Sequence, residues 1–343
     1  MRRGAESGTE RLEVGACLQA MVSRCSRSGP RGTEIACKQA PTFRWRSWWG
    51  VLWAVLFSML AVRAEHALVL QTDFGTKDGA VAAMKGVAVG VSPRLAIFDL
   101  SHENTPFDVW EAAYRLKQAA PFWPAGTVFV SVIDPGVGTE RKSVVLQTKS
   151  GHFFVGPDNG TWTLVAEELG IAAMREIDET KHRREGSAQS HTFHGRDVYV
   201  FTGAQLAAGA TAFADIGPEL ARRVVELAHE KARMENGALI GTIPTLDFQF
   251  GNVWTNIGEA LWTSLGAKPG AIFRVTIVQA GEKVYDGEMP FARTFGDVPE
   301  GAPVLYLNSL MNVAFALNQG DFAETHGIGC GAEWSVRVEK VKR

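Results

Sequence analysis

From about residue 66, short apolar runs alternate with segments of helical spacing. Continuous apolar runs bounded by turn residues are typical of buried strands, whereas apolar residues three and four positions apart are typical of a helix packed on one face. We predict helices over 78–92, 108–119 and 161–169, and strands over 67–71, 95–101, 127–138 with its terminal turn, 143–148 and 152–160 with its turn. This alternation predicts a mixed, mostly parallel sheet between helices.

The pattern changes again in the second half of the chain. Residues 197–209, DVYVFTGAQLAAG, predict a strand followed by a helix, and the charged stretch 219–236 predicts a linker helix. Beyond it the runs ALIGTI, GNVWTNI, AIFRVTIV, KVYDGEM, PVLYLN and WSVRVEK follow one another with turns and no long helical period, which predicts an all-β region. We therefore divide the chain into a leader (1–64), an α/β N-terminal domain (65–236) and a smaller all-β C-terminal domain (237–343).

The leader is basic, because residues 1–46 contain nine Lys and Arg but only four Glu. The uncharged run over 47–62 is sixteen residues long, and a bilayer span needs about 20, so we expect no stable membrane span. The basic flank and the small residues before the fold predict a secretory signal over 44–64, cleaved after Ala64. Such a signal implies a periplasmic or secreted protein. The alternative is a misassigned start, with translation beginning at Met59, which implies a cytoplasmic protein.

Composition narrows the possible partners and cofactors. The formal net charge is -2, whereas nucleic-acid binding usually requires a basic domain, so we expect no nucleic-acid partner. Three of the four cysteines lie in the leader, and Cys330 is the fourth, so the body of the chain cannot close a disulfide within itself. Neither a CxxC motif nor a Cys/His ligand spacing is present. We therefore predict no metal site.

Three aspartates each follow an apolar run: Asp73, Asp134 and Asp158. Ligands of α/β sheets bind at the carboxyl ends of the strands, where these turns are expected. An ionised carboxylate only accepts hydrogen bonds, so Asp73 suits the two hydroxyls of a ribose. The alternative for Asp73, and more so for Asp78, is that the side chain caps the following helix.

A second group of residues suits the activation of water. Arg141 lies seven residues after Asp134, and His194 precedes an apolar run in TFHGRDVYVF. Taken singly, the first two residues could form an ordinary surface salt bridge, and a lone histidine is more often structural. Together, a guanidinium can stabilise developing hydroxide, a neutral imidazole can accept its proton and a carboxylate can orient both. We predict that this set activates water without a metal.

The all-β region contributes a weaker set of polar and aromatic candidates. Asp247 and Asn252 bracket a Phe/Gly turn in LDFQFGNVWTNI and could bind a polar ligand, although such residues usually serve the turn itself. Phe295 could stack on a base, and Ser309 could bind a carboxylate. An aromatic residue at this spacing is more often part of the core.

Taken together, the motifs TDFG, DPGVGT-R, PDNG, TFHGRD and FGNVWTNI make residues 67–340 resemble the S-adenosyl-methionine hydroxide adenosyltransferases, a family that also includes the bacterial fluorinase and chlorinase. The resemblance implies an α/β N-terminal domain and a C-terminal β-barrel. It also implies a homotrimer whose active sites lie between the N-terminal domain of one subunit and the C-terminal domain of the next. The implied substrate is S-adenosyl-methionine, with no further cofactor.

The resemblance also implies individual roles. Asp134, Arg141 and His194 match the water-activating triad, which the halogenating branch lacks. The positions matching substrate contacts are Asp73 for the ribose diol, Phe107 for the methionine side, Asp247 and Asn252 for the methionine amine and nearby polar groups, and Phe295, Ser309, Asn318 and Gln319 for adenine and the carboxylate. Met311 stands where the family usually has glycine, and Leu310 where the fluorinase has arginine, so the carboxylate end of the site departs from the pattern.

The expected reaction is therefore hydrolysis of S-adenosyl-methionine at the ribose C5′, giving adenosine and L-methionine. Three alternatives remain on the sequence alone. The chain could be a halide-using adenosyltransferase of the same fold, a metal-dependent hydrolase using Asp73, Asp78 and His194, or a non-catalytic nucleoside-binding protein.

Overall fold

The structure is a computed structural model that describes residues 65–341 of the 343-residue chain. The predicted leader and signal segment (1–64) lie outside the described residues. Within residues 65–341, no helix is both long enough and apolar enough to cross a membrane.

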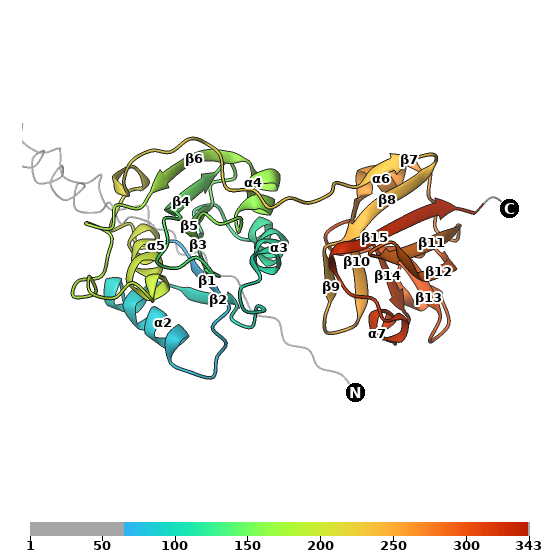
Figure 1. Ribbon diagram of the computed structural model, residues 1–343, viewed down its shortest axis with the longest axis horizontal. Helices are drawn as coiled ribbons and strands as arrows, with labels where there is room; N and C mark the ends of the chain where they lie inside the picture. Colours follow the sequence, from blue (N-terminus) through green and yellow to red (C-terminus); the bar gives the residue numbers. More distant parts are fainter. Residues whose placement is uncertain (1–64, 342–343) are drawn as a thin grey trace, which may run out of the picture. The chain divides into compact units, whose positions relative to one another are not determined.

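A six-stranded mixed sheet forms the centre of the N-terminal region (Figure 1). Its strands are β1 (Leu68–Thr72), β2 (Ile97–Ser101), β3 (Val128–Val132), β4 (Ser143–Thr148), β5 (Phe153–Pro157) and β6 (Ile171–Glu176). They lie in the order β2-β1-β3-β5-β4-β6. The neighbouring pairs among β2, β1, β3 and β5 are parallel, and β4 is antiparallel to both of its neighbours. The predicted mixed α/β character of this region is confirmed.

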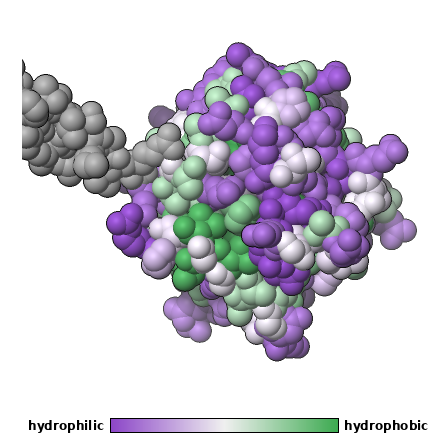
Figure 2. All heavy atoms as spheres, turned by 90° about the vertical axis from the view of Figure 1, so that its left-hand side faces the viewer, coloured by the Kyte–Doolittle hydropathy of each residue, from purple (hydrophilic) through white to green (hydrophobic). Residues whose placement is uncertain are grey.

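Helices bury both faces of this sheet. Helices α2 (Ala80–Val91) and α5 (Val200–Ala207) contribute to one core, and α3 (Val109–Ala119) and α4 (Thr163–Leu169) contribute to the other. Alternate residues of a strand point to opposite faces, so Leu68 and Leu70 of β1 belong to the first core and Val69 to the second. Figure 2, seen from the side of α2 and α5, shows a mostly hydrophilic surface with one apolar area.

The segment predicted as a strand at 197–201 is instead helical. A π-helical turn, η2 (Gly195–Tyr199), leads directly into α5. The apolar run VYVF is compatible with a strand or with a buried helix, and periodicity alone cannot separate the two. The helical choice suits the two glycines of this segment, because a Cβ on Gly195 would lie 3.0 Å from Val132 and one on Gly203 2.5 Å from Val130. Their absence of side chains lets the segment pack closely on β3.

The predicted linker helix over 219–236 is also wrong. Residues 219–232 form no helix, and β7 (Arg233–Glu235) follows them. This segment is instead attached to the sheet region through its backbone amides: Val225 N donates to the carboxylate of Asp158 (2.9 Å), and Leu227 N donates to the hydroxyl of Thr163 (2.9 Å). Leu220, Val224 and Leu227 have the spacing of a helix packed on one face, but Leu220 and Val224 pack against the second core from an irregular backbone instead.

The C-terminal region consists of two antiparallel sheets that share one core. The strands after β7 are β8 (Ala238–Ile243), β9 (Thr245–Asp247), β10 (Asn252–Gly258), β11 (Ile272–Gln279), β12 (Glu282–Pro290), β13 (Pro303–Leu307), β14 (Asn312–Leu317) and β15 (Gly331–Lys340). The larger sheet has the order β12-β11-β15-β8-β7, and the smaller has the order β13-β14-β10-β9. The all-β prediction is confirmed, but the predicted β-barrel is not, because the described strands do not close into one sheet.

Short helices complete the described chain. They are the 3₁₀ turns η1 (Ala120–Phe122), η3 (Phe213–Asp215) and η4 (Phe295–Asp297), and the helices α6 (Glu259–Ser264) and α7 (Phe322–His326).

The close packing of α5 on β3 can be tested with two matched glycine substitutions. Gly203→Ala and Gly86→Ala both place alanine in a helix, which by itself favours helix formation by about 1 kcal/mol. At Gly203 the new methyl group would meet Val130, which is fully buried, whereas at Gly86 nothing lies within 4 Å. We expect Gly203→Ala to lower the free energy of unfolding by about 1–2 kcal/mol and Gly86→Ala to raise it slightly, both measured by urea denaturation. Equal effects of the two changes would contradict this packing.

Candidate active site

The candidate site lies at the carboxyl ends of three neighbouring parallel strands. Asp73 follows β1, Asp134 follows β3 and Asp158 follows β5. The turn after β5 is tied to the end of β3, because Asn159 Nδ2 donates to the carbonyl of Ile133 (2.9 Å). This contact explains the PDNG motif: its asparagine fixes the backbone from which Asp134 projects.

Asp134 and Arg141 form a tightly paired ion pair. Arg141 Nε donates to both carboxylate oxygens (2.9 and 3.1 Å), and Nη2 also donates to Oδ2. The side chain of Asp134 is only 6% exposed and that of Arg141 only 10%. Burial disfavours the charged guanidinium, but the hydrogen bonds and the negative charge of Asp134 outweigh it, so the pKa of Arg141 is raised. Arg141 therefore stays cationic.

The same guanidinium reaches His194. Arg141 Nη2 lies 3.0 Å from His194 Nδ1, although 53 residues separate the two in the chain. His194 is 7% exposed and immediately precedes the π-helical turn. The structure thus brings together the three residues that the sequence predicted as a set.

Tyr199 packs against this set from the π-helical turn. Its ring lies edge-on to the imidazole of His194 (6.2 Å between centroids) and 5.7 Å from the guanidinium carbon of Arg141. Its hydroxyl and that of Ser143 lie 3.1 Å apart, and Ser143 also accepts from Arg141 Nη1 (3.4 Å). Tyr199 was not among the residues predicted from the sequence, where its only signal was its place five residues after His194.

Burial lowers the pKa of His194. Among the surrounding charges, Glu179 and Asp134 oppose this shift, while Arg141 and Arg183 reinforce it. The imidazole is therefore neutral near pH 7, and a neutral imidazole can accept a proton.

Asp73 is held at the end of β1 beside Phe107. Its Oδ2 accepts a hydrogen bond from the backbone amide of Phe107 (2.9 Å), and Phe107 has a left-handed backbone (φ 68°) and is 70% exposed. A buried polar network missed from the sequence supports this strand end: Thr72 bonds His102 (2.9 Å), and Asn104 donates to the Thr72 carbonyl (2.8 Å). The SHEN segment at 101–104 was the available signal.

Two of the candidate aspartates have structural partners instead. Asp78 Oδ1 accepts the amide of Ala80, the first residue of α2, which agrees with the capping alternative. Asp158 anchors Val225, and burial raises the pKa of its carboxyl. Across the part of the chain that the structure describes, no three His, Cys, Asp or Glu side chains are grouped so that they could hold a metal ion. Asp73, Asp78 and His194, which the metal-dependent alternative requires together, therefore do not form such a group within the described residues.

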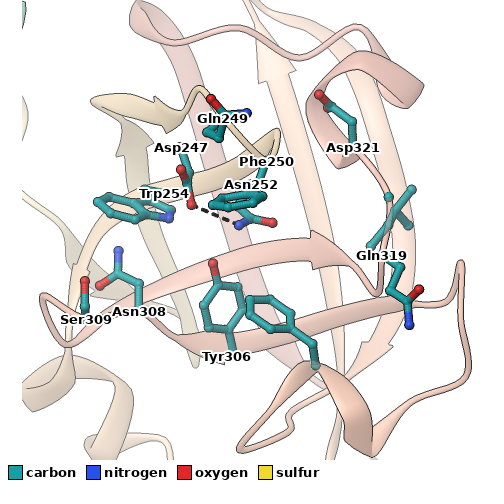
Figure 3. A pocket seen from close by; sticks show the side chains of 13 residues that line it. Asp247, Gln249, Phe250, Asn252, Trp254, Tyr306, Asn308, Ser309, Gln319 and Asp321 are labelled. Atoms are coloured by element: carbon teal, nitrogen blue, oxygen red, sulfur yellow. Dashed lines mark hydrogen bonds between the residues drawn. The ribbon is translucent and has the colours of Figure 1, made fainter.

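A second group of predicted residues lines a cavity of about 690 Å³ in the C-terminal region (Figure 3). Asp247 accepts a hydrogen bond from Asn252 (3.1 Å), which fixes both side chains at the β9–β10 turn. Phe295, Ser309 and Gln319 also line the cavity. Asn318 does not, because its amide donates to the carbonyl of Val298 (2.8 Å) and holds a loop.

The cavity has further walls that the sequence analysis did not identify. Its other lining residues are Gln249, Phe250, Trp254, Tyr306, Asn308, Leu317, Gly320 and Asp321. Burial raises the pKa of Tyr306 to about 12, so its hydroxyl stays protonated. Asn308 Oδ1 accepts the amides of Leu310 (2.9 Å) and Asn312 (3.0 Å), and its buried Nδ2 has no partner in the described structure. That nitrogen can donate to a bound molecule.

Met311, at the family's glycine position, has φ 59°, a backbone conformation that favours glycine.

Family models match most of the residues that the structure describes. Residues 68–217 match the SAM hydroxide adenosyltransferase N-terminal domain, and residues 241–335 match the C-terminal domain of the same family. The chain therefore belongs to the SAM hydroxide adenosyltransferase family.

Individual relatives agree with this assignment. An (R)-S-adenosyl-L-methionine hydrolase of Methanocaldococcus jannaschii is 48% identical over 143 residues, which cover 40% of this chain and about half (52%) of that protein. The enzyme of the same name from Thermus thermophilus is 37% identical over 75% of this chain and 94% of its own length. A fluorinase from an Actinoplanes species is 30% identical over 77% of this chain and 95% of its own length.

A solved structure also shares the fold. The crystal structure of an uncharacterized conserved protein from Thermotoga maritima superimposes with a TM-score of 0.73 at 34% sequence identity, covering 79% of this chain and 99% of that one.

The lowered pKa of His194 predicts a pH-dependent contribution to stability. The unfolded chain takes up a proton at this residue near pH 6.5, whereas the folded protein does so only at lower pH. The folded state thus loses stability as the pH falls below about 6.5. We expect His194→Gln, which cannot titrate, to lose less unfolding free energy between pH 7.5 and 5 than the unmodified protein, measured by urea denaturation. Parallel pH dependences would contradict the shift.

Proposed function

We propose that the chain hydrolyses S-adenosyl-methionine, with an activated water attacking the ribose C5′ and releasing adenosine and L-methionine. The observation that carries this proposal is the continuous contact of Asp134, Arg141 and His194 at the carboxyl edge of the sheet. Membership of the SAM hydroxide adenosyltransferase family and the names of the hydrolase relatives support it.

The reaction is an in-line displacement. A lone pair of water forms the new C5′–O bond, while the C5′–S bond breaks and its electron pair returns to sulfur. Methionine leaves as a neutral thioether, so the leaving group needs no acid. The enzyme must place the water behind C5′, exclude bulk solvent and remove one proton.

Each member of the triad has a separate task in this step. His194 accepts the proton from the attacking water, because its imidazole is neutral. Arg141 stabilises the negative charge that develops on the water oxygen. Asp134 holds the guanidinium through its paired hydrogen bonds and so keeps it against His194.

We assign the remaining candidates to substrate binding. Asp73 Oδ1 accepts no hydrogen bond within the described residues and is open to the ribose hydroxyls, with Phe107 beside it. The C-terminal cavity offers polar groups and an aromatic ring for the adenine and methionine ends: Asp247, Asn252, Phe295, Ser309, Asn308 and Gln319. Asn318 contributes by holding the 298 loop. The relatives are named for the (R) substrate, and we propose the same sulfonium epimer here.

We further propose that residues 65–236 and 237–343 act as two domains of a homotrimer, with each site shared between neighbouring subunits and no cofactor required. In support, the candidate residues fall into two groups. The triad and Asp73 lie at the edge of the six-stranded sheet, and the others line the C-terminal cavity. No hydrogen bond joins the two groups within residues 65–341.

The water step predicts both the products and the fate of oxygen. Incubation of the full chain with the (R) sulfonium epimer in H₂¹⁸O should give equal amounts of adenosine and methionine, with the label in the adenosine 5′-hydroxyl, whereas the other epimer should not be turned over. We expect His194→Ala and Arg141→Ala to lower kcat by about 100- to 10,000-fold, as for the loss of a general base or its partner. Products are measured by chromatography with mass detection.

The same assay separates the alternatives. Chloride-dependent formation of 5′-chloro-5′-deoxyadenosine would indicate the halide-using reaction suggested by the fluorinase relative. Unaltered turnover in both variants would remove the triad from the mechanism. Adenosine that co-purifies and remains bound, without any turnover, would indicate a binding protein.

Shared sites predict complementation between two inactive variants. His194→Ala removes a group of the N-terminal region, and Asp247→Ala removes one of the C-terminal cavity. If each site combines the two regions from different subunits, random mixed trimers regain about one quarter of the sites. The activity of the refolded mixture is compared with that of each variant alone, and sedimentation gives the subunit number. Mixtures as inactive as their components would contradict shared sites.

A further inference from the structure

His194 has a guanidinium at each of its ring nitrogens. Arg141 Nη2 lies 3.0 Å from Nδ1, and Arg183 Nη2 lies 3.3 Å from Nε2. The first arginine belongs to the proposed triad. The second belongs to the turn-rich segment that follows β6.

Arg183 is fixed as firmly as Arg141. Its Nε and Nη2 donate to Glu179 Oε2 (3.1 and 2.6 Å), and its Nη1 donates to the carbonyls of Ser187 (3.4 Å) and Ser190 (3.2 Å). The side chain is only 11% exposed. The guanidinium of Arg183 therefore contacts His194 while its other N–H groups donate hydrogen bonds to Glu179, Ser187 and Ser190.

The residues on either side of Arg183 anchor its backbone. The ring of His182 bonds Gln205 of α5 (2.8 Å) and the carbonyl of Asp215 (3.2 Å). Arg184 pairs with the fully buried Asp197 in the π-helical turn (2.9 Å). The segment is thus attached to the same helix that carries His194, and the guanidinium cannot drift away from the ring without breaking these contacts.

This arrangement disfavours protonation of the ring. A guanidinium only donates hydrogen bonds, and a neutral imidazole has one acceptor nitrogen, whereas an imidazolium has none. Proton uptake would remove this one acceptor nitrogen and would add a third positive charge between the two guanidiniums. The other groups that face the ring are Asp134 and Glu179, each already paired with an arginine, and the rings of Tyr199 and His191.

We propose that Arg183 is a positioning residue that keeps His194 unprotonated in the resting enzyme. The inference rests on the proposed role of His194 as proton acceptor. A weakly basic imidazole is adequate for that role, because the attacking water becomes a strong acid as its bond to C5′ forms. After transfer, the imidazolium faces two cations and readily gives its proton to solvent, which restores the neutral ring for the next substrate.

The test measures the His194 pKa directly, without relying on activity. The full chain is labelled with ¹⁵N-histidine, and the ring signals are titrated by NMR, with His194 assigned by its loss in His194→Gln. We expect the pKa of His194 to rise in Arg183→Gln and to stay low in Arg183→Lys, which retains the charge. An unchanged pKa in Arg183→Gln would overturn the proposal.

Two further variants separate the effect of Arg183 from its surroundings. Lys181 lies two residues before Arg183 and carries the same charge, but its side chain is 65% exposed. Lys181→Gln should therefore leave the His194 pKa unchanged. Arg183→Gln/Glu179→Gln also removes the carboxylate that Arg183→Gln leaves unpaired. The pKa should still rise above that of Glu179→Gln alone. If the pKa does not rise, Glu179 and not Arg183 determines the pKa of His194, which would contradict the proposal.

Activity then distinguishes this inference from the proposed function. If the pKa of His194 returns to about 6.5 in Arg183→Gln, about a quarter of the His194 rings are neutral at pH 6. The kcat of this variant at pH 6 should then be about fourfold lower than its kcat at pH 8. A raised pKa with an unshifted kcat profile would uphold the effect of Arg183 on His194 but contradict His194 as the proton acceptor.

Discussion

The ion pair between Asp134 and Arg141 is the interaction on which the candidate site depends. Both side chains are nearly buried, so each charge is stable in place only because the other is there. Loss of one partner of such a pair typically costs about 3–5 kcal/mol. The pair also leaves one Nη2 hydrogen of Arg141 aimed at His194, so a single ion pair fixes both the charge and the direction of the guanidinium that contacts the proposed proton acceptor.

This dependence extends outwards through the fold. Asn159 fixes the end of β3, from which Asp134 projects, and Ser143 and Tyr199 hold the guanidinium from β4 and from the π-helical turn. The site is therefore built where three strands and one helix meet, and its precision comes from elements that each have their own buried core. Sites on such rigid elements need little rearrangement during the reaction.

The sequence predicted the parts of the fold with a clear local signal. The alternating apolar runs identified the mixed sheet and its first three helices, and the short runs after residue 237 identified the antiparallel region. It failed at 197–201, where an apolar run fits a strand or a helix equally well, and at 219–232, where side-chain acceptors from distant residues hold an irregular backbone. The barrel came from the family resemblance, and the described strands form two sheets instead.

The candidate residues were predictable as types but not as a network. Motif and resemblance identified Asp134, Arg141 and His194, yet Arg183 and His102 act through contacts that no spacing in the chain indicates. Asn308 shows the same limit, because its free amide nitrogen depends on two backbone amides that bind its oxygen. Long-range side-chain pairing of this kind depends on the packed structure.

The π-helical turn before α5 sets the rotational position of His194. A π turn contains one residue more than an α turn, and each residue of a helix advances by about 100° around the axis. A chain one residue shorter between Gly195 and Tyr199 could continue α5 as a regular helix. The imidazole of His194 would then be rotated about the helix axis by roughly that angle, away from the guanidinium of Arg141. In evolutionary terms, a single insertion or deletion here would separate a chain with the proposed water-activating triad from a similar fold without it.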